Sequence, residues 1–244
     1  MRILEITRDE VPKDPLIIVP IGSIEQHGPH LPPLGTDSII ANYVAAEVER
    51  KMRNKALLYP LIAIGSSMEH TGFVGTTWVR FESLIRYLLD FIESVSAWNP
   101  IGVVFVNGHG GNVDALNIVV KEWNYSGGVS PRAYHYYVYN RRVIDYITRY
   151  FPSFGHADAV EASLIAAIDK NLVRWDRITD IEASGNINVF RTIDVSKTGI
   201  IGSLRRDLVR PEIGFEILRF MVDDLLKQIR DIYGITINNE GNNA

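Results

Sequence analysis

The sequence predicts a layered α/β domain whose central sheet is mostly parallel. Uncharged, β-branched segments of strand length recur along the chain, and segments with a helical repeat of apolar residues lie between them. This alternation is typical of a parallel sheet covered by helices. The chain has 244 residues, of which 46% are hydrophobic, and is therefore long enough to bury a large core.

The predicted strands lack charged residues almost throughout, as expected for strands that are buried on both faces. The last of them is rich in tyrosine, and residues 170–212, which follow it, combine strand and loop character. The predicted strands cover residues 16–21, 56–64, 101–106 and 133–139.

Helices are predicted where apolar residues recur every three or four positions. Ile40, Val44 and Val48 show this repeat in the first helix, and Asp37 or Ser38 is predicted to cap it. The predicted helices cover residues 39–52, 83–97, 113–123, 212–233 and a segment that opens near residue 156 and reaches about residue 169. Because no linker, charge run or repeat marks a boundary, we expect one domain over residues 1–237 and a disordered polar tail over 238–244.

Composition and charge limit the classes of function. The formal net charge is −4, which provides no basic surface for nucleic acid. The absence of cysteine excludes disulfides and thiolate metal sites, so a bound metal must use imidazole and carboxylate ligands. The N-terminus lacks the apolar core of a signal peptide, and no apolar stretch is long enough to cross a bilayer. We therefore expect a cytoplasmic protein without nucleic-acid or membrane partners.

Acids and histidines gather in the glycine-rich loops that follow three of the predicted strands, near Ile21, Ile64 and Val106. The carboxyl ends of parallel strands meet at one edge of a sheet, where active sites of such folds lie. Five of the six histidines are in these loops or at a helix start, whereas His135 lies in the tyrosine-rich strand and is interpreted as structural or pocket-lining. The histidines are His27, His30, His70, His109, His135 and His156.

Glu25, His27, Asp37 and His109 have the side chains to bind one or two divalent ions. Two ions would carry four positive charges, which three carboxylates and a bridging hydroxide would neutralise, and Glu161 is the best candidate for the third carboxylate. Such a centre lowers the pKa of water and polarises a carbonyl, which suits hydrolysis of an amide C–N bond. The alternative is that Glu25 and Asp37 only cap loops and that His27 only packs.

The segment Asn107-Gly-His-Gly-Gly-Asn112 follows a strand and precedes a helix. It is interpreted either as a phosphate-binding loop or as a turn that presents His109 while its amides stabilise an oxyanion or a substrate phosphate. The predicted substrate-binding residues are Glu69, His70, Gly110, Gly111 and Asn112.

His156 and Glu161 are the predicted catalytic residues, and His156 is the candidate proton donor to the leaving nitrogen. The two residues are five apart and would not share a face of a regular helix. His156 is therefore expected to precede the first turn, with Asp158 near the N-cap and Glu161 pointing inward. The alternative for Asp158 and Glu161 is a purely structural interaction with the helix dipole.

Together these segments resemble the creatininase (creatinine amidohydrolase) family. The resemblance rests on Gly22-Ser-Ile-Glu-Gln-His-Gly-Pro-His-Leu-Pro, Gly-Thr-Asp37, Glu69-His-Thr-Gly-Phe-Val-Gly-Thr-Thr, Asn107-Gly-His-Gly-Gly-Asn, and His156 with Glu161-Ala-Ser163. It implies a parallel-rich α/β fold and a binuclear zinc, manganese or iron site with Glu25, His27, Asp37 and His109 as ligands, of which Asp37 bridges. It also implies a homo-oligomer, often a hexamer. Members include a formamide deformylase and a peptidase that trims a cofactor precursor peptide.

The sequence departs from the creatinine hydrolases at three places. Those enzymes carry a glutamate two residues after the metal-binding histidine, where this chain has Gly111, so the second metal is expected either to lose that ligand or to take Glu161 instead. They also have tryptophans before the catalytic histidine, whereas residues 125–155 contain none. The loop at 31–36 is one residue longer than usual.

We therefore predict a metal-dependent hydrolase of a non-peptide or cyclic amide C–N bond, with a small-molecule amide as substrate. One alternative is a formamide deformylase acting on a pyrimidine nucleotide intermediate of flavin or deazaflavin biosynthesis. Another is a non-catalytic protein that binds metal or phosphate.

Overall fold

The computed structural model of the chain describes residues 1–29, 32–126 and 131–235. A four-stranded sheet with the strand order β2-β1-β3-β4 forms its centre, and all of its neighbouring strands are parallel. The mostly parallel sheet predicted from the sequence is confirmed. The strands are β1 (Leu16–Ile21), β2 (Ala56–Leu58), β3 (Gly102–Asn107) and β4 (Arg132–Tyr137).

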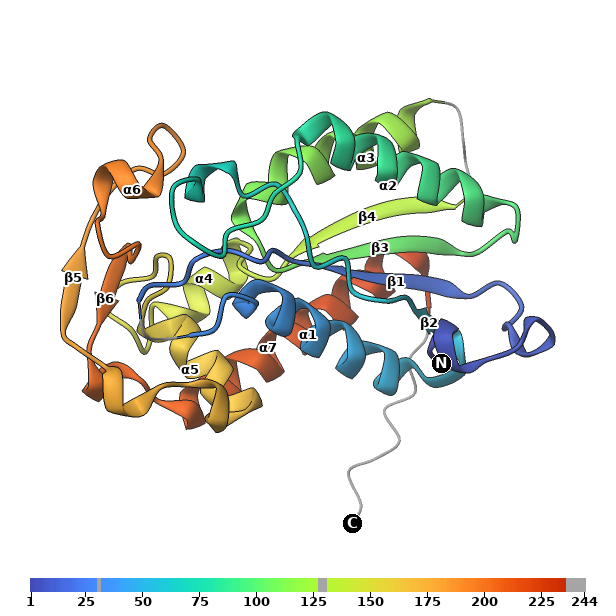
Figure 1. Cartoon of the computed structure of the whole chain (residues 1–244). Coiled ribbons are helices and arrows are strands. Elements are labelled where there is room, and N and C mark those ends of the chain that lie inside the picture. Colours follow the sequence, from blue (N-terminus) through green and yellow to red (C-terminus); the bar gives the residue numbers. More distant parts are fainter. Residues whose placement is uncertain (30–31, 127–130, 236–244) are drawn as a thin grey trace, which may run out of the picture.

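Helices cover both faces of the sheet, as Figure 1 shows. One face packs against α1 (Thr36–Met52) and α7 (Pro211–Tyr233), and the other packs against α2 (Phe81–Ser96) and α3 (Val113–Tyr125). The helix α5 (Ala159–Ile168) packs mainly against α7.

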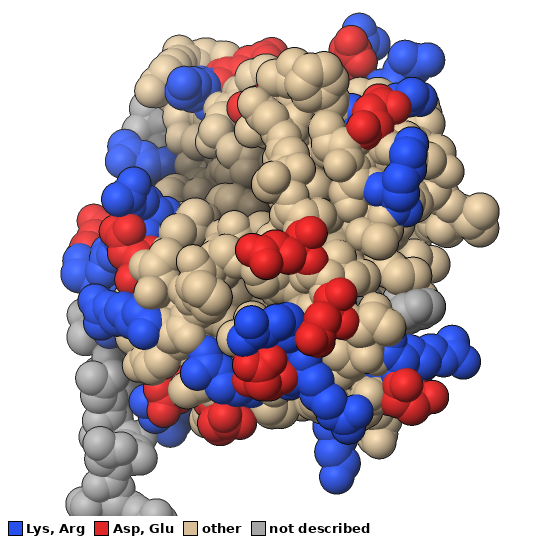
Figure 2. Space-filling view, turned by 90° about the vertical axis from the view of Figure 1, so that its left-hand side faces the viewer, with Lys and Arg blue, Asp and Glu red and all other residues tan. Residues whose placement is uncertain are grey.

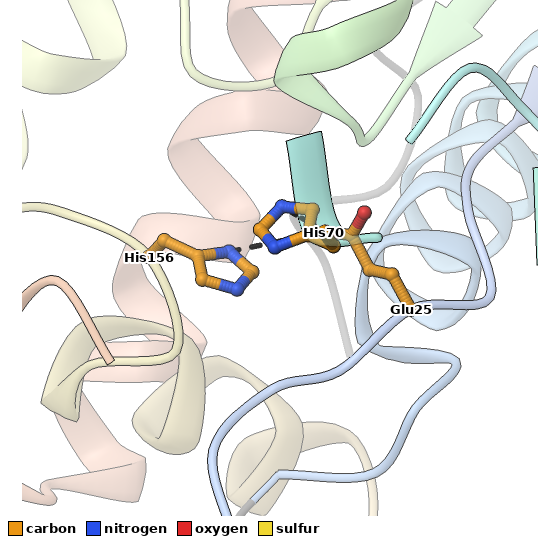
Figure 3. A group of neighbouring side chains, drawn as sticks. All are labelled: Glu25, His70 and His156. Carbon is orange, nitrogen blue, oxygen red and sulfur yellow. Dashed lines mark ion pairs between the residues drawn. The ribbon is translucent and has the colours of Figure 1, made fainter. Parts of the chain in front are cut away.

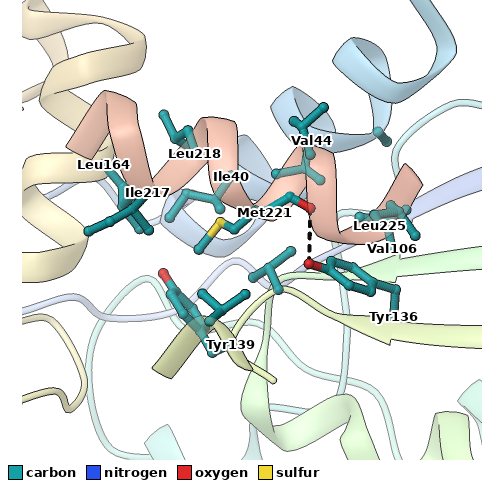
Figure 4. Packing of buried hydrophobic residues seen from close by; sticks show 14 of the residues in the cluster. Ile40, Val44, Val106, Tyr136, Tyr139, Leu164, Ile217, Leu218, Met221 and Leu225 are labelled. Atoms are coloured by element: carbon teal, nitrogen blue, oxygen red, sulfur yellow. Dashed lines mark hydrogen bonds between the residues drawn. The ribbon is translucent and has the colours of Figure 1, made fainter. Parts of the chain in front are cut away.

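Alternate residues of the buried strands enter two separate cores, because successive side chains of a strand point to opposite faces. Leu16 and Ile18 of β1 belong to the core under α1 and α7, whereas Ile17 and Val19 belong to the core under α2 and α3. Figure 4 shows the first of these cores, in which the hydroxyl of the buried Tyr136 donates a hydrogen bond to the Met221 carbonyl (3.0 Å). Burial of strands on both faces explains why they lack charges.

The C-terminal third adds short elements at the end of the sheet where the parallel strands finish (Figure 1). Two of them, β5 (Ile181–Ala183) and β6 (Gly202–Leu204), pair as an antiparallel ribbon. Between them lies α6 (Thr192–Val195), a helix of four residues. These elements form the mixed strand and loop region expected over residues 170–212.

Several predicted boundaries were wrong. The strand predicted over 56–64 ends at Leu58, because Pro60 has no N–H for a ladder. The helix α1 begins at Thr36 after Gly35, so neither Asp37 nor Ser38 caps it, and both lie in its first turn. The short helix α4 (Arg141–Ile147) was not predicted. His30 and the tail at 238–244 lie outside the described residues.

Across the described residues, no helix combines the length and the apolar character needed to cross a membrane.

Candidate metal centre and active site

Five acidic and imidazole side chains from distant parts of the chain meet at the carboxyl edge of the sheet. Their loops follow β1 and β3 or open α1 and α5, and each of the five residues is at most 4% exposed. They are Glu25, His27, Asp37, His109 and Glu161. All except His27 line a cavity of about 840 Å³. Figure 2 shows that this face of the molecule is hollowed.

Asp37 lies between two pairs of these side chains. Its Oδ2 atom is 3.0 Å from Nδ1 of His109, and that nitrogen is 3.3 Å from Oε1 of Glu25. Its Oδ1 atom is 3.4 Å from Nε2 of His27, and that nitrogen is 3.6 Å from Oε2 of Glu161. The two oxygens of one carboxylate thus serve two adjacent groups, which is the arrangement that a bridging ligand requires.

Three of the atoms that face one another are buried polar atoms without a hydrogen-bond partner in the described part of the chain. They are Oε1 of Glu25, Nε2 of His27 and Oδ2 of Asp37. Buried polar atoms are rarely left unsatisfied, and convergent ones indicate an ion. One ligand atom from each of the three residues lies within 4.8 Å of the others. The carboxylate and imidazole donors fit Zn²⁺, Mn²⁺ or Fe²⁺.

The electrostatics of this group also favour a cation. Burial raises the pKa of Glu25 to about 7 and the pKa of Glu161 to about 8. Burial alone would lower the pKa of His27, but the nearby carboxylates of Asp37 and Glu161 raise it to about 10. Carboxylates buried this deeply need positive charge, which the histidines provide only by taking up protons. A divalent ion provides that charge directly.

Two glycines explain how Asp37 reaches the strand ends. A Cβ atom at Gly108 would lie 2.1 Å from the carbonyl oxygen of Asp37, and a Cβ atom at Gly22 would lie 2.4 Å from Cα of Ser38. Any side chain at either position would collide with the first turn of α1. Glycine therefore lets the ends of β1 and β3 contact the turn that carries Asp37.

The loop after β3 is held by side-chain amides. The Asn107 side chain accepts a hydrogen bond from the His109 N–H (3.0 Å) and donates one to the His109 carbonyl (2.9 Å). His135, interpreted from the sequence as structural or pocket-lining, lies 3.3 Å from the same Asn107 amide and 3.1 Å from Asn117. Its position supports the structural interpretation.

His70 and His156 stand beside Glu25 at the cavity wall, and Figure 3 shows their rings close together. Nε2 of His70 is 3.4 Å and Nδ1 of His156 is 3.8 Å from Oε1 of Glu25. Burial lowers the pKa of His70 to about 4 and lowers that of His156 well below its ordinary value. Both rings are therefore neutral at neutral pH and available for proton transfer or hydrogen bonding.

Gln26 contacts both of these histidines, although no pattern in the sequence marks it as a site residue. Its Nε2 atom lies 3.1 Å from Nδ1 of His70, 2.8 Å from Nε2 of His156 and 3.0 Å from the carbonyl of Gly199. Nε2 of His156 is also 3.0 Å from the Gln26 carbonyl, which can only accept a hydrogen bond. The same nitrogen thus contacts both a donating amide and an accepting carbonyl, and Nδ1 of His156 faces the Glu25 carboxylate.

Nδ1 of His70 also has two polar neighbours. It lies within hydrogen-bond distance of the Thr192 hydroxyl (3.0 Å) and of the Gln26 amide (3.1 Å). Nε2 of His70 points toward Glu25. Each of the two neighbouring rings thus directs one nitrogen at the Glu25 carboxylate.

The residues predicted to bind substrate divide into two groups. Glu69, His70, Gly110 and Gly111 line the cavity. Asn112 does not, because it is fully buried and its amide binds the Ser66 N–H (2.8 Å) and the Gly22 carbonyl (3.0 Å). Asn112 therefore connects three loops and has no atom free for substrate.

Other wall residues were missed because no local pattern marks them. Residues 187–191 line the cavity, and Val189 and Phe190 are more than half exposed there. As predicted, Asp158 caps α5, since its side chain accepts hydrogen bonds from the N–H groups of Val160 and Glu161. This cap fixes the turn from which Glu161 points into the cluster.

Comparison with known proteins is consistent with this site. Residues 2–229 match the family model described as "Creatininase: Creatinine amidohydrolase". The chain belongs to the creatininase family. As a member of this family, it is an amidohydrolase, and its site is of a type that binds metal. The fold and the family predicted from the sequence are confirmed.

Two similar proteins within this family carry the name "Mycofactocin precursor peptide peptidase". The one from Mycobacterium ulcerans (strain Agy99) is 43% identical over 235 residues, covering 88% of this chain and 84% of that protein. The one from Mycolicibacterium smegmatis is 44% identical over 117 residues, and that match covers 46% of this chain but only 47% of the relative.

Solved creatininases share the fold. The structure named "Creatininase Mn" superposes with a TM-score of 0.80 at 22% identity, covering 96% of this chain and 99% of that one. A likeness at this level of identity shows the fold alone.

Proposed function

We propose that the protein is a metal-dependent hydrolase that cleaves an amide bond of a short peptide. The observation that carries this proposal is the paired cluster around Asp37, with its three unsatisfied ligand atoms, at the floor of an open cavity of about 840 Å³. The extended similarity to precursor peptide peptidases supports a peptide in place of the cyclic amide favoured by the sequence analysis.

The proposed centre holds two divalent ions, zinc, manganese or iron. Glu25, Asp37 and His109 would hold one, and His27, Asp37 and Glu161 the other. Bound ions supply Lewis-acid activation of water and of the amide carbonyl. Three carboxylates offset three of the four positive charges, so the buried site is close to neutral.

The surrounding residues are placed to handle protons and to orient substrate. Neutral His156 can take a proton from the attacking water and return it to the leaving nitrogen, which is the proton-donor role predicted from the sequence. His70 lies in the adjacent position, where its Nε2–H form can donate to the carbonyl oxygen of the substrate. Gln26 contacts both rings and so holds them in position.

The cavity walls suit a peptide better than a nucleotide. Apolar side chains form much of the wall, including Met68, Phe81, Phe154, Val189 and Phe190. Asp114, in the first turn of α3, adds a carboxylate where a phosphate-binding loop would need a helix N-terminus free of negative charge. Arg191 lines the cavity but is paired with Asp194 (2.8 Å). No feature of the described residues favours the formamidopyrimidine nucleotide.

Substrate profiling of the metal-loaded protein tests the proposal. The purified chain is loaded with zinc, manganese or iron(II) in turn and offered short peptides, creatinine, a cyclic ureide and a formamidopyrimidine nucleotide. We expect release of new amino termini from at least one peptide and no turnover of the other compounds. Hydrolysis of a cyclic amide with no cleavage of any peptide would overturn the proposal of a peptide substrate. It would not contradict the proposed metal centre.

The expected homo-oligomer and the cytoplasmic location stay predictions. Gel filtration coupled to light scattering tests the first.

A further inference from the structure

Position 111 is where the chain departs most clearly from the creatinine hydrolases, and the structure shows what occupies that space. A Cβ atom on Gly111 would lie 2.4 Å from Oε1 of Glu69, 2.4 Å from Nε2 of His109 and 2.3 Å from the carbonyl oxygen of Ser66. No side chain fits there. A carboxylate is nevertheless present at this point, and it belongs to Glu69 from a different loop.

Glu69 approaches His109 from the side opposite the proposed metal. It lies in η4 (Met68–His70), and its Oε1 atom is 3.2 Å from Nε2 of His109. The carbonyl oxygen of Ser66 is 3.0 Å from the same nitrogen. Both neighbours of Nε2 only accept hydrogen bonds, so Nε2 must carry a proton. The other nitrogen, Nδ1, therefore directs its lone pair at Glu25 and Asp37, which lie 3.3 Å and 3.0 Å away.

We propose that Glu69 is a positioning residue of the metal centre, which holds His109 in the Nε2–H form and so presents Nδ1 to the ion. The proposal rests on the metal centre proposed above. A carboxylate that accepts the outer N–H of a metal-binding histidine fixes the orientation of the ring and makes the inner nitrogen a stronger ligand. The Ser66 carbonyl accepts the same hydrogen, but it carries no charge and contributes less.

This role differs from the substrate binding predicted for Glu69 from the sequence. The Glu69 side chain is 19% exposed, so it has a cavity-facing part, but its closest partner is the imidazole. It also explains why glycine is required at 111, since any larger residue would displace the carboxylate from His109. The chain thus has a carboxylate beside this histidine without a side chain at position 111.

Metal-binding titrations of three variants test the proposal. The dissociation constant of Zn²⁺ is measured by competition with a chromogenic chelator for the wild type, Glu69→Ala, Glu69→Gln and Asp114→Asn. We expect Glu69→Ala to weaken binding about 10- to 100-fold. Glu69→Gln keeps an oxygen acceptor without the charge, so it should restore part of the loss. Asp114→Asn is the matched control, because it removes a charge from the same cavity wall but contacts no histidine in the described structure.

Thermal unfolding of each metal-free variant verifies that it is folded, and Glu69→Gln preserves the size of the side chain if Glu69→Ala is unstable. Wild-type affinity for Zn²⁺ in both Glu69 variants would overturn the positioning role of Glu69. It would not contradict the proposed metal centre. A wild-type protein that binds no Zn²⁺, Mn²⁺ or Fe²⁺ would overturn the metal centre and the positioning role together.

Discussion

The sheet with its strand-end loops and the segment from residue 170 to 204 contribute to the same cavity but are built in different ways. Every residue of β1 and β3 is buried, and the loops that follow them carry Glu25, His27 and His109. In contrast, no residue of β5 is buried, and the segment around it provides Val189 and Phe190 at the cavity wall. A rigid sheet edge thus holds the proposed ligands, whereas a less buried segment shapes the space for substrate.

This difference implies a division of roles. Changes at the sheet edge should affect metal binding and activity together, and changes in the later segment should affect turnover or substrate affinity while the metal stays bound. His156 and Glu161 lie at the border between the two regions. Glu161 belongs to the cluster through its contact with His27, and His156 lies beside both Glu25 (3.8 Å) and the His27 ring, with 4.6 Å between the two ring centroids.

The largest effect is expected for Asp37→Asn. The neutral amide cannot place a charged oxygen on each of two ions, so both proposed sites lose a ligand. We expect activity to fall by more than about 10⁴-fold, since a catalytic ion contributes several kcal/mol to the transition state. Elemental analysis of the dialysed protein should show less than the wild-type metal content, and an unchanged content would contradict the bridging role.

His156→Ala is expected to reduce turnover without reducing metal binding. Because His156 is proposed to move protons and not to hold the ion, turnover should fall about 10²- to 10³-fold while metal content stays at the wild-type value. Steady-state kinetics with elemental analysis of the same sample measures both. Retained turnover would remove His156 from the proton-transfer role, and loss of metal would assign it to the sheet-edge group.

Metal affinity should rise with pH. His27 and Glu161 have pKa values of about 10 and about 8 and so are protonated at neutral pH before an ion binds. A bound ion requires neutral imidazole and ionised carboxylate, so binding releases protons and becomes tighter as they are removed. The expected slope is about tenfold per pH unit for each proton released, up to about pH 8 for the Glu161 proton and up to about pH 10 for the His27 proton. Calorimetric titration of Zn²⁺ at several pH values measures it, and a constant affinity would argue against these two ligands.

The smallest effect is expected for Phe190→Ala in the later segment. The ring is 56% exposed at the cavity wall, so a bound peptide would cover only part of it. Loss of this contact should cost about 1 kcal/mol, which corresponds to a roughly fivefold higher KM with little change in kcat. The surface variant Tyr125→Ala, 80% exposed and not among the residues that line the cavity, is the control. A fall in metal content would show that the two regions are not separate.

Local sequence signals predicted the sheet edge well. The strand predicted over 16–21 agrees with β1 at both ends, because an uninterrupted β-branched run between polar loops leaves little choice of register. Since parallel strands end at one edge, the loops that carry Glu25 and His109 were expected to meet, and they do. The prediction needed only the order of strands and the composition of their loops.

The later segment and the interactions between loops were not predictable in this way. The contacts of Gln26 depend on the position of Gly199, which lies in a region without periodic pattern. Glu69 was assigned to substrate because its contact with His109 follows from the packing of one loop against another. The helix α4 was missed since seven residues contain too few turns to display a helical repeat.

The parallel pairing of the sheet also determines when the metal centre can form as the chain folds. β1 pairs with β2 and β3 without any hairpin, so each pairing must close a long loop before it gains stability, and such topologies fold slowly. Glu25 and His109 meet only after β1 and β3 have paired, and Glu161 joins them only when α5 has docked. The unfolded chain therefore contains no preformed cluster, and an ion that binds late stabilises the completed fold without accelerating its earliest steps.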